Sequence, residues 1–442
     1  MYNLGMNNYI KENFVNLKEE TLKIESFFNN IALITQNLSD IMDTKFSNND
    51  IENIIKSLSN IDSYSIQLSI VVICKDEERC IERCIESIIR EKNNNDELII
   101  LDTGSKDNTL NILKNNFADI EVYNYKWNSN FSEIRNEGIK LAKSEWVFFI
   151  DADEYLEKDS LNNLKEYLKI IKFLNIKNLV IGPTIINSDS HIVFGVKRIL
   201  NKKDNINFYG LIHEEPRNSL RNELNSIKSI SFSNVILHHD GYTKEIISQK
   251  KKIIRNSELL KKMIELEPTY PRWLYFYCRD SKSILTKEEY VEGLNKVVLL
   301  CGTNKYFEEY KIRALSNLTE QSILDGNLHE AEKFIEKLKE IAPSLSDVAY
   351  FDSCIKLIYE KYNLNILLND LIIYRNKHQE IAQCSMHSNN FHIDLAIANL
   401  FFELGEYEKA FNIYSKLNEN DFGEFKNKYK VLYKTLKKYF NE

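Results

Sequence analysis

Residues 145–154 read Glu-Trp-Val-Phe-Phe-Ile-Asp-Ala-Asp-Glu, a run of bulky apolar residues that ends directly in carboxylates. Aromatic and β-branched residues in so short an apolar run predict a buried β-strand. Asp151, Asp153 and Glu154 would then lie at the carboxyl end of that strand. In an open α/β sheet, ligands bind in the crevice beyond the carboxyl ends of the strands. The stretch therefore predicts a ligand site at this edge of the sheet.

Asp151 and Asp153 are separated by the small residue Ala152. Two carboxylates at this spacing can approach one hard cation, which prefers oxygen ligands. The opposing interpretation is a solvated acidic turn after a strand, and for an isolated Asp-x-Asp it is the commoner case. The rest of the chain therefore has to decide between the two.

The composition is that of an ordinary globular protein of 442 residues, with 43% hydrophobic and 28% charged residues. This length predicts two or three domains. A net charge of −7 disfavours a nucleic-acid partner, because surfaces that follow phosphates need a basic excess. The chain has no apolar run of membrane-spanning length and no visible secretory signal, and its seven cysteines lack paired spacing. We therefore expect a cytoplasmic protein that does not insert into a membrane.

Three further segments predict repeated strand–helix units before the acidic stretch. Strands are expected at residues 68–74, 97–102 and 120–125, each followed by a turn and a helical pattern. The first of these helices carries its apolar residues at helical spacing: Ile81, Cys84, Ile85, Ile88 and Ile89. This regular alternation predicts an α/β fold with a mostly parallel sheet. Three of the strand ends carry carboxylates, which packing alone does not require.

Four motifs follow one another in order: Val72-Ile73-Cys74-Lys75-Asp76-Glu77-Glu78, Asp102-Thr103-Gly104-Ser105-x-Asp107-x-Thr109, Phe131-Ser132-x-x-Arg135-Asn136 and Asp151-Ala152-Asp153-Glu154. As an ordered set, they make residues 67–242 resemble family 2 glycosyltransferases of the GT-A fold. Within that family, the chain is similar to the sublancin-type peptide S-glycosyltransferases, which attach a sugar to a cysteine of a bacteriocin precursor. The similarity continues through residues 208–216, 239–242 and 266–274. One departure is visible, because the family usually has Asn where this chain has Asp76.

The resemblance implies a metal-dependent, inverting transfer of a hexose from a UDP-sugar, with UDP-glucose as the expected donor. The residues expected to hold Mg²⁺ or Mn²⁺ are Asp151, Asp153 and His239. Those expected to bind the nucleotide sugar are Glu77, Asp102, Arg135 and Asp151. Glu214 or Glu215 is expected to serve as the general base, with His213 as its neighbour. For His239, the interpretation as a hydrogen-bonded structural residue carries about equal weight.

The two flanking regions have helical patterns. Residues 1–66 predict helices that pack on a neighbour or on a second copy of the chain, so a homodimer is one expected arrangement. Residues 243–442 are nearly all helical in pattern. The three domains predicted are therefore 1–66, 67–242 and 243–442.

Helix pairs in the last region resemble tetratricopeptide repeats. The second helices of these pairs are expected at Lys287–Leu300, Asp325–Ile341 and Leu404–Leu417, and the repeat between residues 344 and 385 is weak. Stacked helix pairs form a concave surface suited to a peptide, so the precursor peptide is expected to bind partly there. The alternative is that these helices only brace the catalytic domain or a dimer.

Two other functions stay open on the sequence. The first is O-glycosyl transfer to Ser or Thr of a peptide or protein, or to a surface saccharide, because the motifs read the donor and not the acceptor. The second is an inactive helical-repeat scaffold, which is disfavoured because Asp102, Asp151 and Asp153 are all present. The sequence leaves undetermined the sugar, the number of sugars added, the metal preference, the oligomeric state and the choice between Glu214 and Glu215.

Overall fold

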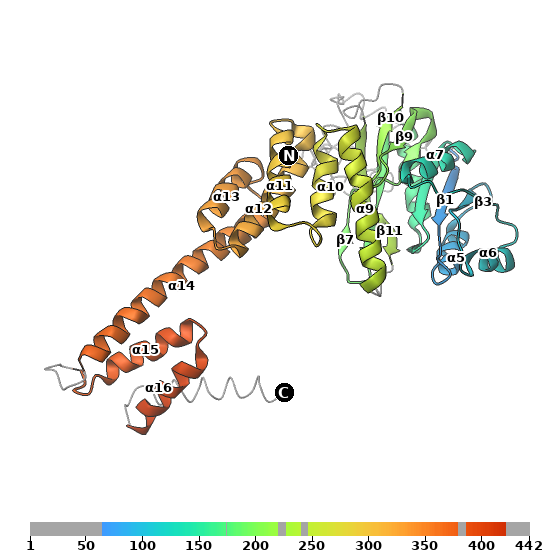
Figure 1. The fold of residues 1–442 in the computed structure, drawn as a ribbon. Coiled ribbons are helices and arrows are strands. Elements are labelled where there is room, and N and C mark those ends of the chain that lie inside the picture. The colour runs from blue at the N-terminus through green and yellow to red at the C-terminus, as the bar shows by residue number, and fades with distance from the viewer. Residues whose placement is uncertain (1–63, 174, 220–226, 240–245, 379–385, 421–442) are drawn as a thin grey trace, which may run out of the picture. The chain divides into compact units, whose positions relative to one another are not determined.

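A computed structural model describes residues 64–173, 175–219, 227–239, 246–378 and 386–420. The chain divides into two compact units between Thr286 and Lys287 (Figure 1). The helices predicted within residues 1–66 fall almost wholly outside the described residues, and so does the Gly-Tyr pair that follows His239. The first unit extends past residue 242, so it includes two helices that the sequence assigns to the repeat region.

The first unit is built on a nine-stranded sheet. Its strands are β1 (Leu68–Cys74), β2 (Glu97–Asp102), β3 (Val122–Asn124), β4 (Trp146–Asp151), β5 (Glu154–Leu156), β6 (Leu179–Asn187), β7 (Ile192–Val193), β8 (Ile199–Asn201) and β11 (Lys228–His239). They lie in the order β3-β2-β1-β4-β8-β6-β11-β5, with β7 paired to β6. The first four strands of that order are parallel, whereas β8 runs antiparallel to both β4 and β6. The α/β prediction is confirmed, and the sheet is parallel in one half and mixed in the other.

A separate antiparallel pair is formed by β9 (Ile206–Tyr209) and β10 (Glu215–Asn218). The helices of this unit are α5 (Ile81–Glu91), α6 (Thr109–Asn116), α7 (Phe131–Leu141), α8 (Ser160–Phe173), α9 (Ile246–Leu266) and α10 (Pro271–Ser281). Helix α10 contacts the loop that links β9 to β10, so this loop has a neighbour from a distant part of the sequence. The pair was not anticipated, because its four-residue strands carry no clear alternation.

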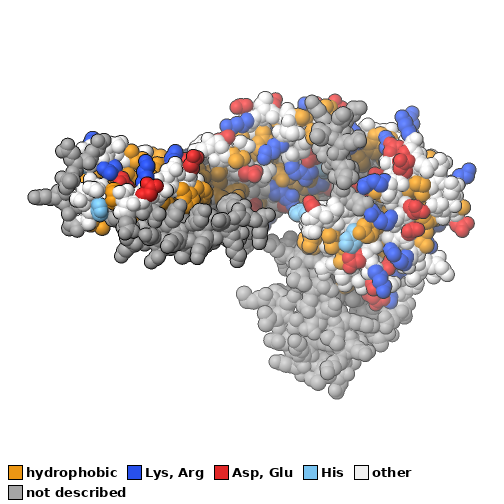
Figure 2. All heavy atoms as spheres, turned by 90° about the horizontal axis from the view of Figure 1, so that it is seen from below, with side chains coloured by type: hydrophobic (Ala, Val, Ile, Leu, Met, Phe, Trp, Pro, Cys, Tyr) orange, Lys and Arg blue, Asp and Glu red, His pale blue; other side chains and the backbone are white. Residues whose placement is uncertain are grey.

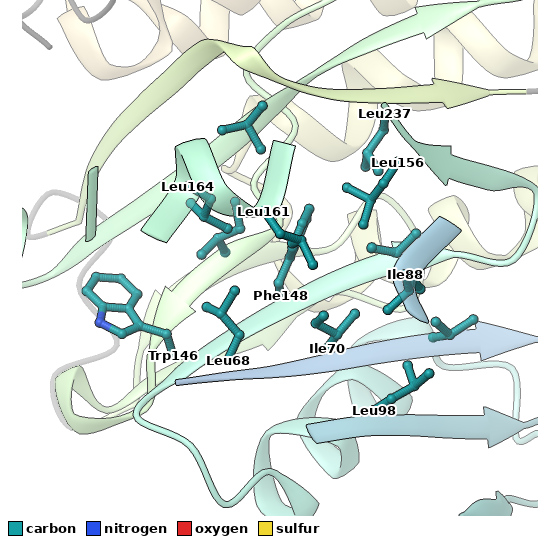
Figure 3. Close-up of a cluster of buried hydrophobic side chains, with 14 of the residues drawn as sticks. Leu68, Ile70, Ile88, Leu98, Trp146, Phe148, Leu156, Leu161, Leu164 and Leu237 are labelled. Carbon is teal, nitrogen blue, oxygen red and sulfur yellow. The ribbon is translucent and has the colours of Figure 1, made fainter. Parts of the chain in front are cut away.

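The strands present alternate side chains to two cores, as the two-residue period of a strand requires. Leu68, Ile70 and Phe148 lie in a buried cluster with Leu161 and Leu164 of α8 (Figure 3). The same cluster includes the predicted apolar face of α5, apart from its last residue, which is 41% exposed. This face of the sheet is therefore closed by α5, α6 and α8.

The opposite face of the sheet packs against α7 and β9. Val71 and Phe149 lie there in a second buried cluster with Ile134 of α7 and Phe208 of β9. Gly138 lets α7 approach β1 closely, because a Cβ atom at this position would lie 2.8 Å from Cγ1 of Val71. This approach fixes α7, and with it the arginine of the third motif, against the carboxyl end of the sheet.

The second unit consists of helices. They are α11 (Lys287–Cys301), α12 (Glu308–Leu324), α13 (Leu328–Ile341), α14 (Ser346–Lys377), α15 (Phe391–Glu403) and α16 (Tyr407–Glu419). Helix α12 packs on α13, and α15 packs on α16, with a left-handed glycine in each connecting turn: Gly326 and Gly405 (Figure 1). These pairs agree with the predicted repeats. None of the helices among the described residues combines the length and the apolar character needed to cross a membrane.

The weak repeat between residues 344 and 385 is replaced over most of its length by the single helix α14, which has 32 residues. Neither Gly nor Pro occurs between Ser346 and Lys377, so the two residues that most strongly interrupt a helix are absent there. The amino-terminal part of α14 buries Val348 and Phe351, whereas Leu368 packs with α15. One continuous helix therefore takes the place of a helix pair.

Candidate active site

The loops that follow β1 and β2 are tied together by reciprocal hydrogen bonds. The backbone N–H of Asp76 donates to Oγ of Ser105 over 2.9 Å, and the N–H of Lys106 donates to Oδ1 of Asp76 over 2.6 Å. Glu77 is joined to the second loop in the same way, through its N–H and Oγ1 of Thr109 at 2.8 Å. Asp76 has a φ of 55°, a left-handed conformation that Asp and Asn adopt more readily than other non-glycine residues. Asp therefore meets the same backbone requirement as the family's usual Asn.

Asp102 ends β2 and is 1% exposed. Its carboxylate accepts hydrogen bonds from the backbone N–H groups of Gly104 at 2.9 Å and of Ser105 at 3.1 Å. Its neighbour in the sheet register is Cys74 of β1. Asp102 and Glu77, both predicted to contact the nucleotide, thus lie on adjacent loops at one edge of the sheet.

Asp151 is held between two arginines. Nη2 of Arg135, from α7, donates to Oδ1 of Asp151 over 3.2 Å, and Nη2 of Arg198, just before β8, pairs with Oδ2. Arg198 also donates to Oε1 of Glu154 over 3.1 Å, and Nε of Arg135 pairs with Oε1 of Glu214. Each of the five residues comes from a different segment. We call them the arginine network.

The network sets the protonation of its carboxylates. Burial raises the pKa of Asp151, but Arg198 and Arg135 outweigh this and hold that pKa well below its usual range. For Glu214, burial is likewise outweighed by Arg135, and the pKa is lowered. Burial raises the pKa of Glu154 to about 7, opposed by Arg198 and reinforced by the charge of Asp151. Asp151 and Glu214 are therefore ionised at neutral pH, whereas Glu154 is partly protonated in this range.

Asp153 and His239 form a pair beside this network. The antiparallel register of β5 and β11 places His239 opposite Glu154, and Nε2 of His239 lies 3.2 Å from Oδ2 of Asp153. Nδ1 of His239 lies 3.0 Å from Oδ1 of Asn187. The hydrogen bond with Asp153 raises the pKa of His239, against the effect of burial. Two of the three predicted metal ligands thus face each other.

Asp151 does not complete a three-ligand cluster. Among the described residues, no group of three His, Cys, Asp or Glu side chains is arranged to hold a metal ion. Both oxygens of Asp151 are engaged by guanidinium groups. The Asp153 carboxylate still offers the oxygen ligand that Mg²⁺ or Mn²⁺ prefers, and Mg²⁺ usually keeps few protein ligands and completes its shell with phosphate and water.

Glu215 is part of a buried structural cluster. It is 3% exposed and accepts hydrogen bonds from the hydroxyl of Tyr270 and from Nη2 of Arg217, both at 2.9 Å. Arg217 in turn pairs with Glu267, at the end of α9, over 2.6 Å. The sequence predicts Glu215 as a possible base, and the structure places it in this buried cluster. Its position instead fixes β10 against α9 and α10.

His213 is held by α10. It has a φ of 50°, its Nε2 lies 2.5 Å from Oδ2 of Asp280, and its ring stacks on Phe276 at 4.3 Å between centroids. Nη2 of Arg272 donates to the backbone carbonyl of His213 over 2.7 Å. Asp280 and Arg198 were missed in the sequence, because nothing in their local sequence shows that either contacts a distant charged residue.

Replacing Glu154 by Gln should change how stability depends on pH. The folded-state pKa of about 7 lies above the usual glutamate value of about 4.3, so the folded protein keeps a proton that the unfolded chain has released. This contribution to stability is complete below about pH 4.3 and is lost as the pH rises through 7. Relative to wild type, Glu154→Gln should therefore gain on the order of 2 kcal/mol between pH 5 and pH 8.

Urea unfolding followed by tryptophan fluorescence measures this difference, because all three tryptophans (Trp127, Trp146 and Trp273) lie in the first unit. The exposed substitution Glu289→Gln, in the second unit, serves as a control. If the free energy of unfolding of Glu154→Gln differs from that of wild type by the same amount at pH 5 and at pH 8, the assigned pKa is contradicted.

Comparison with known proteins identifies the family. A sequence model of Glycosyl transferase family 2 matches residues 69–176. The SPbeta prophage-derived glycosyltransferase SunS of Bacillus subtilis (strain 168) is 30% identical over 324 residues, which are 72% of this chain and 73% of SunS. A TPR repeat-containing protein of Synechococcus elongatus is 36% identical over 102 residues, 23% of this chain and 24% of that relative.

Solved structures give a weaker match. The crystal structure of S. aureus TarS 1-349 in complex with UDP-GlcNAc matches with a TM-score of 0.37 and 14% identity, over 67% of this chain and 92% of that chain. The assignment therefore rests on the sequence relatives, and above all on the long match to SunS. The chain belongs to glycosyl transferase family 2 and is a glycosyltransferase of the GT-A fold.

Proposed function

We propose that this glycosyltransferase transfers a hexose, with inversion, from a UDP-sugar to a cysteine side chain of a precursor peptide, with UDP-glucose as the donor. The observation that carries the donor half is the meeting of three motifs at one sheet edge. Asp102 ends β2, Asp151 ends β4, and Asp153 lies against His239. This arrangement fits a nucleotide at the ends of β1 and β2 and a diphosphate beyond β4.

Unpartnered donors in the arginine network support an anionic ligand. Nη1 of Arg135, and Nε and Nη1 of Arg198, are buried without a hydrogen-bond partner among the described residues. Buried N–H groups without partners are costly, and a diphosphate or a sugar hydroxyl would supply acceptors.

Asp153 and His239 are the residues that would hold Mg²⁺ or Mn²⁺ beside the diphosphate. A divalent cation there would neutralise the charge that develops on the leaving diphosphate. Asp102 and Glu77 would contact the uridine from the two tied loops. Asp151, fixed by both arginines, would accept a hydrogen bond from the ribose or orient the arginines toward the diphosphate.

A peptide fits the charge of this protein better than a nucleic acid does. The net charge is −7, and Figure 2 shows acidic and basic side chains intermixed on the visible face, without a continuous basic surface. The helix pairs α12–α13 and α15–α16 would bind part of the precursor. O-glycosyl transfer to Ser or Thr is the second candidate, since the residues proposed to bind the donor do not distinguish one acceptor from another.

Asp153→Asn should abolish the metal dependence of donor binding. The substitution keeps the size of the side chain but removes the anionic ligand that faces His239. In calorimetric titrations, UDP-glucose should bind wild type more tightly with Mg²⁺ than with EDTA, and the variant should bind equally weakly in both. Asp119→Asn, at an exposed position, is the matched control. If the folded wild-type protein binds no UDP-sugar tightly, the donor assignment is refuted.

The acceptor is tested with two synthetic peptides that differ only in one residue, Cys or Ser, at the modified position. A cysteine thiol has a reference pKa of about 8.5, so it is far more easily deprotonated than an alcohol. Transfer measured by mass spectrometry should therefore occur on the Cys peptide at least about 10²-fold faster than on the Ser peptide. Equal rates on the two peptides, or a faster rate on the Ser peptide, would contradict the proposal of S-glycosyl transfer and favour O-glycosyl transfer.

A further inference from the structure

We propose that His213, oriented by Asp280, is the general base that removes the proton of the acceptor. This inference rests on the proposed glycosyl transfer and adds the group that activates the acceptor. It replaces both carboxylates of the Phe208–Pro216 segment in that role and assigns a function to α10, which lies outside the four donor motifs.

The two carboxylates next to His213 are engaged elsewhere. Glu215 is 3% exposed and bound to Arg217 and Tyr270. Glu214 is paired with Nε of Arg135, and this pairing lowers its pKa against the effect of burial. A carboxylate stabilised by a guanidinium is a weak base, so neither residue is suited to accept the proton of a thiol.

The imidazole of His213 is fixed in one orientation. Asp280 binds its Nε2 at 2.5 Å, Phe276 stacks on the ring, and Arg272 holds its backbone carbonyl. The left-handed backbone of His213 is an unusual conformation for a residue with a side chain, and such positions concentrate at functional sites. The side chain is 24% exposed, so an acceptor can reach it.

The Asp280 contact selects the useful tautomer. A carboxylate accepts from Nε2–H, which leaves the lone pair of Nδ1 available to take a proton. Burial raises the pKa of Asp280, but the hydrogen bonds and charges of His213 and Arg279 together outweigh this and lower the pKa, so the group is an acceptor at neutral pH. The other charged groups around the ring are Arg279, whose Nη2 lies 3.4 Å from Nε2, and Arg272, both from α10, and Glu214 from its own loop.

The position of His213 matches the task. It directly precedes Glu214, which forms an ion pair with Arg135. Arg135 in turn pairs with Asp151 at the end of β4. In the step we propose, the S–H proton moves to Nδ1 and the sulfur electron pair forms a bond to the anomeric carbon. The bond from that carbon to the diphosphate oxygen breaks, and the diphosphate leaves with the electron pair. Atoms and charge balance without a further reactant.

Asp280→Asn tests the orientation of the imidazole. The amide of Asn keeps the hydrogen bond but donates to Nε2, which places the ring proton on Nδ1 and removes the base. With UDP-glucose and the Cys peptide at pH 7, kcat should fall about 10²–10⁴-fold. The affinity for UDP-glucose and the urea midpoint should stay at the wild-type values. Asp119→Asn is again the control, and His213→Ala should regain activity when free imidazole is added.

The pH dependence of the activity of Asp280→Asn distinguishes a role in proton transfer from a purely structural role. Above about pH 8.5, the acceptor thiol ionises without help, so the deficit of Asp280→Asn should shrink toward wild type as the pH rises from 7 to 9.5. A deficit that stays constant over this range would indicate only a structural role, and full activity of Asp280→Asn at pH 7 would overturn the proposal. If wild type binds no UDP-sugar, the proposed function itself fails, which the calorimetry reveals independently.

Discussion

The candidate site depends on the ion pairs that hold the carboxylate of Asp151 between Arg135 and Arg198. This carboxylate joins the end of the central strand β4 to α7 on one side and to the segment before β8 on the other. Through Arg198 it reaches Glu154 in β5, and through Arg135 it reaches Glu214 in the β9–β10 loop. Removing one partner would leave charge in this network uncompensated, which destabilises the fold most at the buried members Arg198 and Glu154.

This constraint divides the acidic stretch into groups with different chemistry. Asp151 is anionic and immobilised, Glu154 is buried with a pKa raised to about 7, and Asp153 is turned toward His239. Three carboxylates within four residues thus serve as a positioning group, a structural group and a candidate metal ligand. In the mechanism we propose, the acceptor side is organised separately, because Asp280 of α10 fixes His213 in the way that the arginines fix Asp151.

The sequence predicted the part of the fold that local patterns control. The strands before residue 155 and the helices between them follow from periods of two and 3.6 residues, and the structure places their carboxylates at one sheet edge. The antiparallel strands β5 and β8 could not be predicted in the same way, because their pairing depends on partners far away in the chain. The continuous α14 was missed because a weak helix pair was expected there, whereas the segment has neither Gly nor Pro to interrupt a helix.

The site was predictable to the same extent. Residues of the ordered motifs, such as Asp102 and Asp153, could be named from their spacing. Arg198 and Asp280 could not, because nothing in their local sequence marks a charged residue that contacts another one more than 40 positions away. The burial of Glu215 was equally invisible, since its partners Arg217 and Tyr270 gain meaning only when β10 packs against α10.

The role of the arginine network is tested most directly by calorimetric titration of UDP-glucose and Mg²⁺ into Arg198→Lys. Lysine keeps the positive charge, but its single ammonium lacks the planar fork that bridges Asp151 and Glu154. If the network shapes the donor site, this variant should fold normally and bind UDP-glucose at least about tenfold more weakly than wild type, whereas Arg313→Lys, at an exposed helix position, should bind like wild type. Wild-type affinity in a folded Arg198→Lys would show that the donor site does not depend on the arginine-held Asp151.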